Sequence, residues 1–363
     1  MLFRLPARHW LPLAILLIAP SLVLAQTRAE QREAASTSSD ETAAAVALEL
    51  PPVKVAAAAE QAVRPVVAGR RRRPSMVGYI EDSTIQSQVR FRFDSGLGNN
   101  VPDRAEFFYG KCGCYKYVPP PARDLDAPGP GQGIPTEINF REFYSLAEFA
   151  IDERFSVFGE LPFRGIDPQA FVPTGLQDWE GQSGIGDLRF GGKASLFNDG
   201  DNGVTAMVRM AFPTGDSQKG LGTNHASIEP SLLFHSALTD RVGVEAQLGY
   251  WASIGGSAGV NSEDSFAGDV LTWGIGPSFD AYSSSTLSIS PVVELVGWHV
   301  IGGFQTCVTC DTAEAGGTNI VNIKFGARAM VNGRHSIYGG FGWGLTDAVW
   351  YDKLFRFEYR LGF

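Results

Sequence analysis

The sequence predicts an all-β protein, namely a transmembrane antiparallel up-and-down β-barrel of about 12 strands that is preceded by a disordered leader. Three observations predict this fold. Segments in which apolar and polar residues alternate recur along the chain from residue 85 onward. Most of these segments reach the roughly 9 to 11 residues that a tilted strand needs to cross a bilayer. The connections between them alternate between short and long, which is typical of outer-membrane barrels.

Residues 1–25 are expected to be a signal peptide. Arg4 and Arg8 precede an apolar run that closes on LVLAQ, where Val23 and Ala25 fit a small-residue cleavage site. Residues 26–84 are rich in Ala, Glu, Ser, Pro and Val and have no sustained apolar face. This composition predicts a disordered periplasmic leader.

Residues 85–363 are expected to form the outer-membrane barrel. In IQSQVRFRFD, alternation places Phe91 on an apolar face and Arg90 and Arg92 on a polar face. The same pattern predicts eleven further strands near residues 138–151, 155–163, 186–197, 204–213, 226–238, 242–251, 270–281, 287–299, 319–330, 336–345 and 350–363. An even number of strands places the N-terminus and the C-terminus of the barrel on the periplasmic side.

The connections support the same topology. Short connections are expected at residues 152–154, 198–203, 239–241, 283–285 and 332–334. Long connections are expected at residues 95–137, 164–185, 214–225, 252–269 and 300–318, and the last connection, 346–349, is short. Aromatic residues near the segment ends, such as Trp251, Trp298, Trp343 and Trp350, are expected to form belts at the membrane interfaces.

The final stretch, KLFRFEYRLGF, carries a candidate assembly signal. Phe357, Tyr359, Leu361 and Phe363 alternate with charged residues up to the last position. This pattern resembles the C-terminal strand of bacterial outer-membrane proteins. The resemblance implies that the barrel assembly machinery recognises these four residues, and that the protein resides in the cell outer membrane of a Gram-negative-type bacterium.

The polar phase of the strands predicts which side chains line the lumen. The main candidates are Arg90, Arg92, Arg189, Lys193, Arg209, Glu229, Glu245, Glu294, Lys324, Arg328, Arg356 and Glu358. Together with Arg360 and with Asp94, Glu160, Asp187, Asp280 and Asp352, the polar face carries nine cations and nine anions. This balance differs from a ring of one sign, which would indicate ion selectivity. The balance favours cross-lumen pairing, a polar passage for neutral or mixed solutes, or a largely filled interior. The long loop 95–137 is a candidate plug or lid.

Four cysteines lie in two of the long loops, Cys112 and Cys114 in KCGCYKY and Cys307 and Cys310 in QTCVTCD. Oxidation is expected outside the cell wall, so these residues are disulfide candidates. They could pair locally within each loop or join the two loops, and a four-thiolate metal site is the alternative. We predict no cofactor and no metal.

Other function classes are disfavoured. A net charge of −9 and a pI near 5.1 argue against a nucleic-acid partner, because phosphate contacts need clustered Lys and Arg. Catalysis is not expected, because His235 and Ser236, like His335 and Ser336, are adjacent in a strand and would face opposite sides. We therefore predict that the protein is not an enzyme and nominate no catalytic residue.

A narrower resemblance lies in the middle of the chain. It rests on GIGDLRFGGKASLF and on the PTGD that follows MVRMAF, which contribute Gly184, Gly186, Asp187, Pro213, Thr214, Gly215 and Asp216. Over residues 140–363 the chain resembles the outer-membrane family labelled as the putative MetA pathway of phenol degradation. The resemblance implies a barrel that moves small solutes, with aromatic or hydrophobic compounds as candidates.

We therefore predict an outer-membrane channel or transporter for the passive passage of small solutes. Its expected partners are outer-membrane lipid, the barrel assembly machinery and a small-molecule solute. The alternative is a closed structural or surface-interaction barrel that acts through its outer loops.

Overall fold

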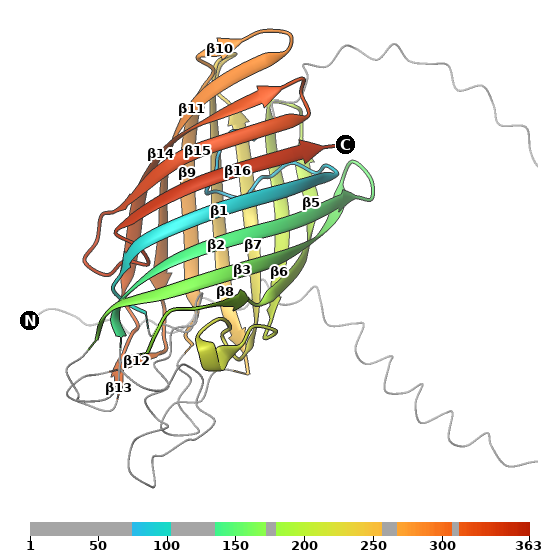
Figure 1. Ribbon diagram of the computed structural model, residues 1–363. Coiled ribbons are helices and arrows are strands. Elements are labelled where there is room, and N and C mark those ends of the chain that lie inside the picture. Colours follow the sequence, from blue (N-terminus) through green and yellow to red (C-terminus); the bar gives the residue numbers. More distant parts are fainter. Residues whose placement is uncertain (1–74, 103–134, 172–178, 256–266, 307–311) are drawn as a thin grey trace, which may run out of the picture. The chain divides into compact units, whose positions relative to one another are not determined.

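The computed structural model describes residues 75–102, 135–171, 179–255, 267–306 and 312–363. These residues form a closed β-barrel whose wall has twelve antiparallel strands (Figure 1). The strands of the wall are β1 (Gln88–Asn99), β2 (Pro135–Ala150), β3 (Phe155–Phe171), β5 (Leu188–Asn198), β6 (Asn202–Phe212), β7 (Ala226–Ala237), β8 (Val242–Ile254), β9 (Val270–Phe279), β11 (Leu287–Val300), β14 (Asn319–Val331), β15 (His335–Gly344) and β16 (Lys353–Gly362).

Each wall strand pairs with the one before and the one after it in the chain, so the topology is up-and-down. The barrel closes where β1 pairs with β16, in a register that runs from Gln88 opposite Gly362 to Leu97 opposite Lys353. The predicted fold class and the number of strands are confirmed. Closure leaves no open sheet edge along the wall, which is what a barrel in a bilayer requires.

Four short strands and one helical turn complete the described elements. β4 (Gln182–Ile185) pairs with β3, and β10 (Tyr282–Ser283) pairs with β11. β12 (Phe304–Thr306) and β13 (Thr312–Glu314) form a separate hairpin, and η2 (Ser217–Lys219) is a 3₁₀ turn. No helix among the described residues is long and apolar enough to cross a membrane.

The two ends of the barrel differ in their connections. At one end, called the turn end here, the strands are joined by residues 151–154, 199–201, 238–241, 280–286 and 332–334. At the other, the loop end, they are joined by the long connections and by residues 345–352. Asn332 and Gly333 both have positive φ (52° and 65°), as the tight hairpin turn between β14 and β15 requires.

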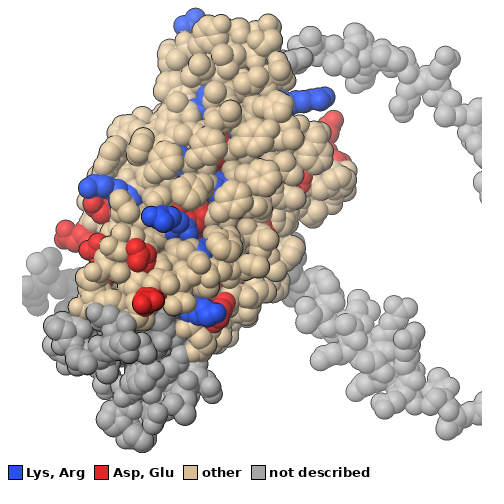
Figure 2. Space-filling view, in the orientation of Figure 1, with Lys and Arg blue, Asp and Glu red and all other residues tan. Residues whose placement is uncertain are grey.

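The strands alternate between a polar inner face and an apolar outer face. In β1, Arg90 and Arg92 are buried in the interior whereas Phe91 is 41% exposed on the outside. Figure 2 shows one side of this outer surface, which is largely free of charge between a group of charged residues toward the loop end at the lower left and a few toward the turn end at the top and upper right. Such an apolar band is the surface that a bilayer-spanning barrel presents to lipid.

The aromatic belts only partly match the expectation. Trp343 is exposed on the outside, but Trp251 and Trp350 are buried and Trp298 lies on the inner phase of β11. All three of these inner tryptophans line a cavity inside the barrel. The prediction of an interfacial position was therefore wrong for them, because position near a strand end does not tell which face a side chain occupies.

The C-terminal strand has the outer face that an assembly signal would use. Phe357 is 46% exposed and Phe363 is 73% exposed, while the Phe363 amide donates to the Ser87 carbonyl at 3.1 Å. We expect deletion of Phe363 to lower the amount of folded protein in the outer membrane, because the last aromatic residue is part of the predicted signal. Quantitative blotting of outer-membrane fractions tests this, and normal levels of the deletion variant would contradict it.

Candidate functional site

The candidate site is the interior of the barrel. All twelve predicted lumen residues lie there, on the inner phase of their strands. Most of them line a cavity or join a network of ion pairs, whereas Glu245 and Glu294 accept hydrogen bonds from backbone amides inside the barrel. The same alternation places Glu142 and Glu148 of β2 and Arg164 of β3 inside. These three residues are additions to the predicted lumen set. Glu142 and Glu148 follow the alternation of the predicted strand 138–151, whereas Arg164 lies just beyond the predicted strand 155–163.

The interior also holds a segment that precedes the wall. Residues 75–87, called the inner segment here, run inside the barrel without forming a strand (Figure 1). Val77 is 0% exposed and Ile80 is 2% exposed. The leader was expected to be disordered to residue 84, and its last ten residues differ from that expectation because the wall satisfies their backbone groups. Residues 1–74 lie outside the described residues.

Two glutamates of the wall accept hydrogen bonds from the backbone of the inner segment. The Glu294 carboxylate accepts from the amides of Gly78 (3.1 Å), Tyr79 (2.8 Å) and Ile80 (2.9 Å). Glu245 Oε1 accepts from the Met76 amide at 2.8 Å. Backbone donors away from water need such partners, so these carboxylates replace the pairing that a strand would have supplied.

Three arginines of the wall donate to the carbonyls of the same segment. Arg328 donates to Met76 (3.1 Å) and Val77 (2.6 Å), and Arg356 donates to Gly78 at 2.7 Å. Arg360 donates more weakly to the Val77 carbonyl at 3.3 Å. Donors and acceptors of the inner segment are therefore both satisfied by charged side chains of the wall.

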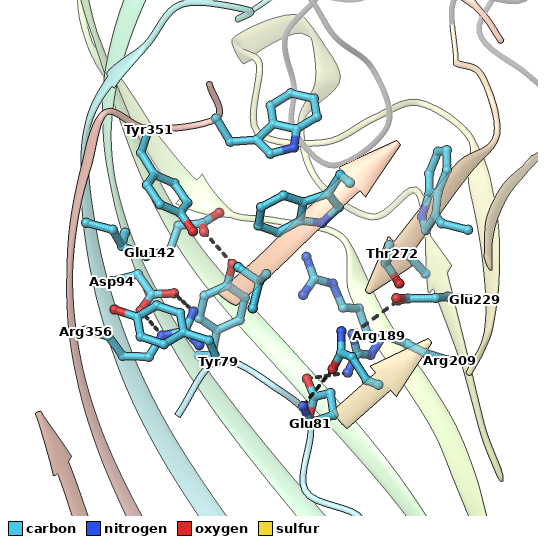
Figure 3. A pocket seen from close by; sticks show the side chains of 18 of the residues that line it. Tyr79, Glu81, Asp94, Glu142, Arg189, Arg209, Glu229, Thr272, Tyr351 and Arg356 are labelled. Atoms are coloured by element: carbon cyan, nitrogen blue, oxygen red, sulfur yellow. Dashed lines mark hydrogen bonds and ion pairs between the residues drawn. The ribbon is translucent and has the colours of Figure 1, made fainter. Parts of the chain in front are cut away.

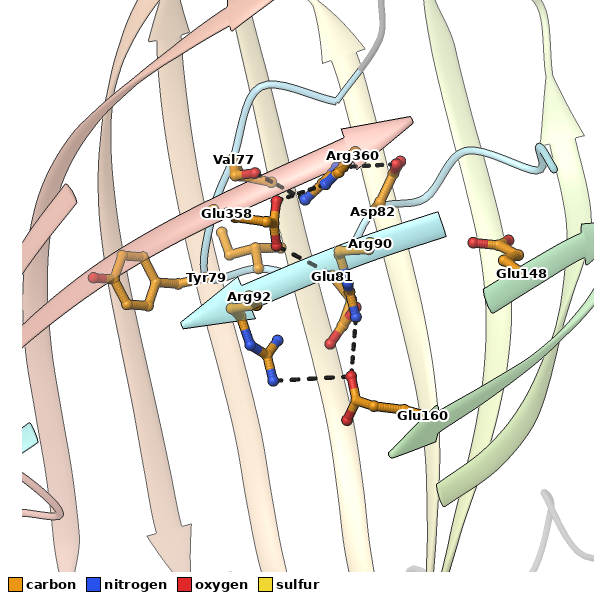
Figure 4. Close-up of polar contacts among 12 residues, drawn as sticks. Val77, Tyr79, Glu81, Asp82, Arg90, Arg92, Glu148, Glu160, Glu358 and Arg360 are labelled. Atoms are coloured by element: carbon orange, nitrogen blue, oxygen red, sulfur yellow. Dashed lines mark hydrogen bonds and ion pairs between the residues drawn. The ribbon is translucent and has the colours of Figure 1, made fainter. Parts of the chain in front are cut away.

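The acidic side chains of the inner segment complete its attachment (Figure 4). Glu81 pairs with Arg209 at 2.6 Å and with Arg90 at 3.1 Å, and Asp82 pairs with Arg360 at 3.1 Å. These two acids supply part of the negative charge that balances the inward arginines. Sequence reasoning missed them because they lie outside any alternating strand.

Close packing accompanies these bonds. A Cβ atom at Gly78 would lie 2.3 Å from the ring of Tyr338, and a Cβ atom at Gly276 would lie 2.7 Å from Val77 Cγ1. A side chain at either position would displace these neighbours, so the glycines mark where the inner segment approaches the wall most closely. The inner segment therefore packs closely against side chains of the wall.

Glu358 is the centre of the charge network of the wall. Its carboxylate lies 2.6 Å from Arg360, 2.8 Å from Arg328 and 3.9 Å from Arg90. A second cluster surrounds Glu160, which lies 2.9 Å from Arg189. Lys193 pairs with Glu148 at 3.0 Å and Arg209 with Glu229 at 3.2 Å, so much of the predicted cross-lumen pairing is present.

A cavity of about 210 Å³ lies on the loop side of the inner segment (Figure 3). Its aromatic lining includes Tyr79, Phe140, Tyr144, Trp251, Trp298, Trp350 and Tyr351, and its charged lining includes Glu81, Asp94, Glu142, Arg164, Asp187, Arg189, Arg209, Glu229, Lys324 and Arg356. The cavity thus joins aromatic surfaces to charged groups in an enclosed space, which is common at small-molecule sites.

A second cavity, of about 940 Å³, lies at the turn end. Asp82, Thr84 and Ile85 line it, whereas Tyr79 and Glu81 line the first cavity, called the loop-end cavity here. The inner segment therefore contributes residues to both cavities and lies between them.

The histidines are held by neighbouring polar groups. His235 Nδ1 lies 3.1 Å from Ser83 Oγ, His299 Nδ1 lies 2.8 Å from Asn319 Oδ1, and His335 Nδ1 lies 2.8 Å from the Tyr359 hydroxyl. The described residues contain no group of three or more His, Cys, Asp or Glu placed to hold a metal ion. The four cysteines, and with them the predicted disulfides, lie outside the described residues, as does most of the loop 95–137.

Solved structures with a similar chain trace include three outer-membrane proteins. The COG4313 outer membrane channel from Pseudomonas putida F1 has 12% identity and a TM-score of 0.48, with 79% of this chain and 99% of that chain covered. The beta domain of the Bordetella autotransporter BrkA has 14% identity and a TM-score of 0.45, covering 77% and 100%. The KdgM porin has 8% identity and a TM-score of 0.38, covering 76% and 99%.

A search of curated proteins finds no match to this sequence. A protein-family model matches residues 129–282, a span shorter than the range 140–363 over which the motifs suggested a resemblance. It contains the glycine-rich start of β5 and the PTGD loop. The resemblance to the family described as "Putative MetA-pathway of phenol degradation" is therefore confirmed over residues 129–282.

Proposed function

We propose that the protein is an outer-membrane channel for the passive passage of small solutes, and that the inner segment holds it in a closed form. The observation that carries this proposal is the position of residues 75–87 between two cavities that lie toward opposite ends of the barrel. If the segment leaves, the two cavities become one path through the barrel.

The outer surface supports the location in the membrane. Large apolar side chains such as Phe163 (51% exposed) and Phe341 (56% exposed) face outward along a closed wall. Exposing such a surface to water is unfavourable, and burying it in lipid removes that cost. The same surface supports outer-membrane lipid as a partner.

The interior supports passage without strong ion selectivity. Inward cations are paired with inward anions, as Arg356 is with Asp94 (2.5 Å) and Arg164 with Glu142 (2.6 Å). Paired charges present little net field to a passing ion. Neutral or mixed small solutes therefore suit this lumen better than a single class of inorganic ion.

The bonds between the inner segment and the wall are of a kind that allows the segment to be released from the lumen. Its described residues make no strand pairing with the wall, and most of their bonds end on flexible charged side chains. When the segment leaves, water that enters the lumen can replace these bonds, which limits the net cost of breaking each to about 1.5–3 kcal/mol.

A disulfide lock tests the proposal. With cysteine at both positions, Val77→Cys/Gly276→Cys should form a bridge, because a Cβ atom at Gly276 would lie 2.7 Å from Val77 Cγ1. We expect discrete openings of the refolded full chain in planar bilayers, loss of those openings in the oxidised double variant, and their return after reduction. Wild-type protein treated with the same oxidant and reductant is the control for its own loop cysteines, and peptide mapping identifies the 77–276 bridge.

Two results would contradict the proposal. Equal conductance of the locked and the unlocked protein would show that solute does not pass where the inner segment lies. Silence of folded protein, both unlocked and after weakening of the segment's attachment, would instead favour the closed surface-interaction barrel that acts through its outer loops.

A further inference from the structure

Lys324 is placed unusually among the cations of the loop-end cavity. It projects from β14, is 3% exposed and lines this cavity. Its ammonium lies 3.6 Å from the centre of the Tyr79 ring, 5.0 Å from that of Tyr351 and 5.7 Å from that of Trp298. Aromatic faces attract a cation, but they do not neutralise its charge.

The arginines of the same cavity are each paired with a carboxylate. Arg164 pairs with Glu142 at 2.6 Å, Arg189 with Glu160 at 2.9 Å, Arg209 with Glu81 at 2.6 Å and Arg356 with Asp94 at 2.5 Å. Within the described ranges, no carboxylate oxygen lies within ion-pair distance of Lys324. A buried cation without a counter-ion is costly, so this position suits an anion that comes from outside the chain.

Unsatisfied hydroxyl groups surround the same space. The hydroxyls of Tyr79, Tyr351 and Thr272 line the cavity or face it and are buried, and each has no hydrogen-bond partner among the described residues. Tyr351 is 6% exposed and Thr272 is 3% exposed. Buried hydroxyls are normally hydrogen-bonded, so orphaned ones at a cavity indicate a missing acceptor.

The volume and the aromatic lining of the loop-end cavity restrict which molecule could carry such an anionic group. A dry cavity of about 150 Å³ is known to hold benzene, so about 210 Å³ accommodates one ring with a small substituent. Trp298 and Trp350 supply flat apolar surface beside Lys324 and Tyr351. Flat rings pack favourably against such side chains.

We propose that the loop-end cavity binds an organic anion with a single aromatic ring and a carboxylate. The carboxylate pairs with the Lys324 ammonium and accepts hydrogen bonds from the tyrosine hydroxyls, while the ring packs on the tryptophans. A carboxylate can accept several charge-assisted bonds at once, which neutral ring compounds cannot. This inference names the solute class of the proposed channel and rests on that proposed function.

Calorimetric titration of the refolded full chain tests the inference, with benzoate as the probe and benzamide as its uncharged counterpart. We expect benzoate to bind the wild type more tightly than benzamide does. Lys324→Met should weaken benzoate binding by at least about tenfold, because one charge-assisted bond is lost. The same substitution should leave benzamide binding unchanged, and Tyr351→Phe should weaken benzoate severalfold.

Lys219→Met is the matched control, because Lys219 is also at the loop end but its side chain is 56% exposed and pairs with Asp216. This variant should bind benzoate as the wild type does. A shift in gel mobility between unheated and heated samples shows that each variant has folded.

Three results would overturn the inference, namely equal affinity for benzoate and benzamide, unchanged benzoate binding in folded Lys324→Met, or no benzoate binding to folded wild type. Binding is measured in detergent solution and does not depend on conduction. A protein that conducts but does not bind benzoate would therefore contradict this inference alone, whereas one that binds benzoate but never conducts would contradict the proposed passage and keep the binding site.

Discussion

Replacing Glu294 by glutamine is expected to raise the fraction of time that the channel is open by at least about tenfold. The Glu294 side chain is 0% exposed and accepts from three consecutive amides of the inner segment, at 2.8 to 3.1 Å, and from the Tyr338 hydroxyl at 3.2 Å. Glutamine keeps the volume but has one acceptor oxygen and no charge. Each hydrogen bond to a charged group contributes about 1.5–3 kcal/mol, so losing even one should shift the equilibrium toward the released segment.

Single-channel recording of refolded protein measures this open fraction directly. Glu153→Gln is a suitable control, because Glu153 lies in an exposed turn between β2 and β3. It should record as the wild type does. If Glu294→Gln protein is folded and its open fraction is that of the wild type, the inner segment does not control the passage.

Glu358→Ala is expected to lower the free energy of unfolding by about 3–5 kcal/mol, which is the usual cost of removing one partner of a buried ion pair. Glu358 is 0% exposed and faces Arg328 at 2.8 Å and Arg360 at 2.6 Å. Without it, these two arginines and Arg90 would lie close together in the interior with less negative charge to balance them. The wall would be affected as well as the inner segment, because Arg328 and Arg360 also donate to the Val77 carbonyl.

Urea unfolding of the detergent-solubilised barrel, followed by the change in gel mobility, measures this loss. Asp352→Ala is the matched control, because the Asp352 side chain is 61% exposed at the loop end and its ion pair with Lys353 is long, at 3.7 Å. A surface pair of this kind contributes little. Unchanged stability of Glu358→Ala would show that the arginines are balanced by other carboxylates of the network.

Much of the wall could be predicted from the sequence because polar and apolar residues alternate within each strand separately. In β6, Thr205 is buried while Val208 on the other face is 41% exposed, as the alternation requires. The same local rule placed Lys324 and Glu358 in the lumen. It also applies to Glu142, which lies in the predicted strand 138–151. Arg164 was missed because the predicted strand 155–163 ended one residue before it, whereas β3 continues to Phe171.

The inner segment could not be predicted in the same way. Met76 bonds to Arg328 and to Glu245, which are 252 and 169 positions away in the chain. Residues 75–84 do not alternate at a strand period. A segment whose backbone groups bond to side chains of distant strands has no pattern of its own by which the sequence would reveal it. The partners become visible only when the barrel brings β8, β11 and β14 together.

Alternation at period two is a local property of an extended chain, so the sequence alone predicts the class of fold, the number of strands and the face of most strand side chains. Trp251, Trp298 and Trp350 are the exceptions, because they were assigned from their position near strand ends. Closure of the barrel was needed to show that residues 75–87 occupy the lumen. It was also needed to show that Lys324, unlike the neighbouring arginines of the cavity, has no carboxylate within ion-pair distance among the described residues. The physical reason is that pairing across a lumen depends on which distant strands meet and at what depth, and closure of the barrel sets both.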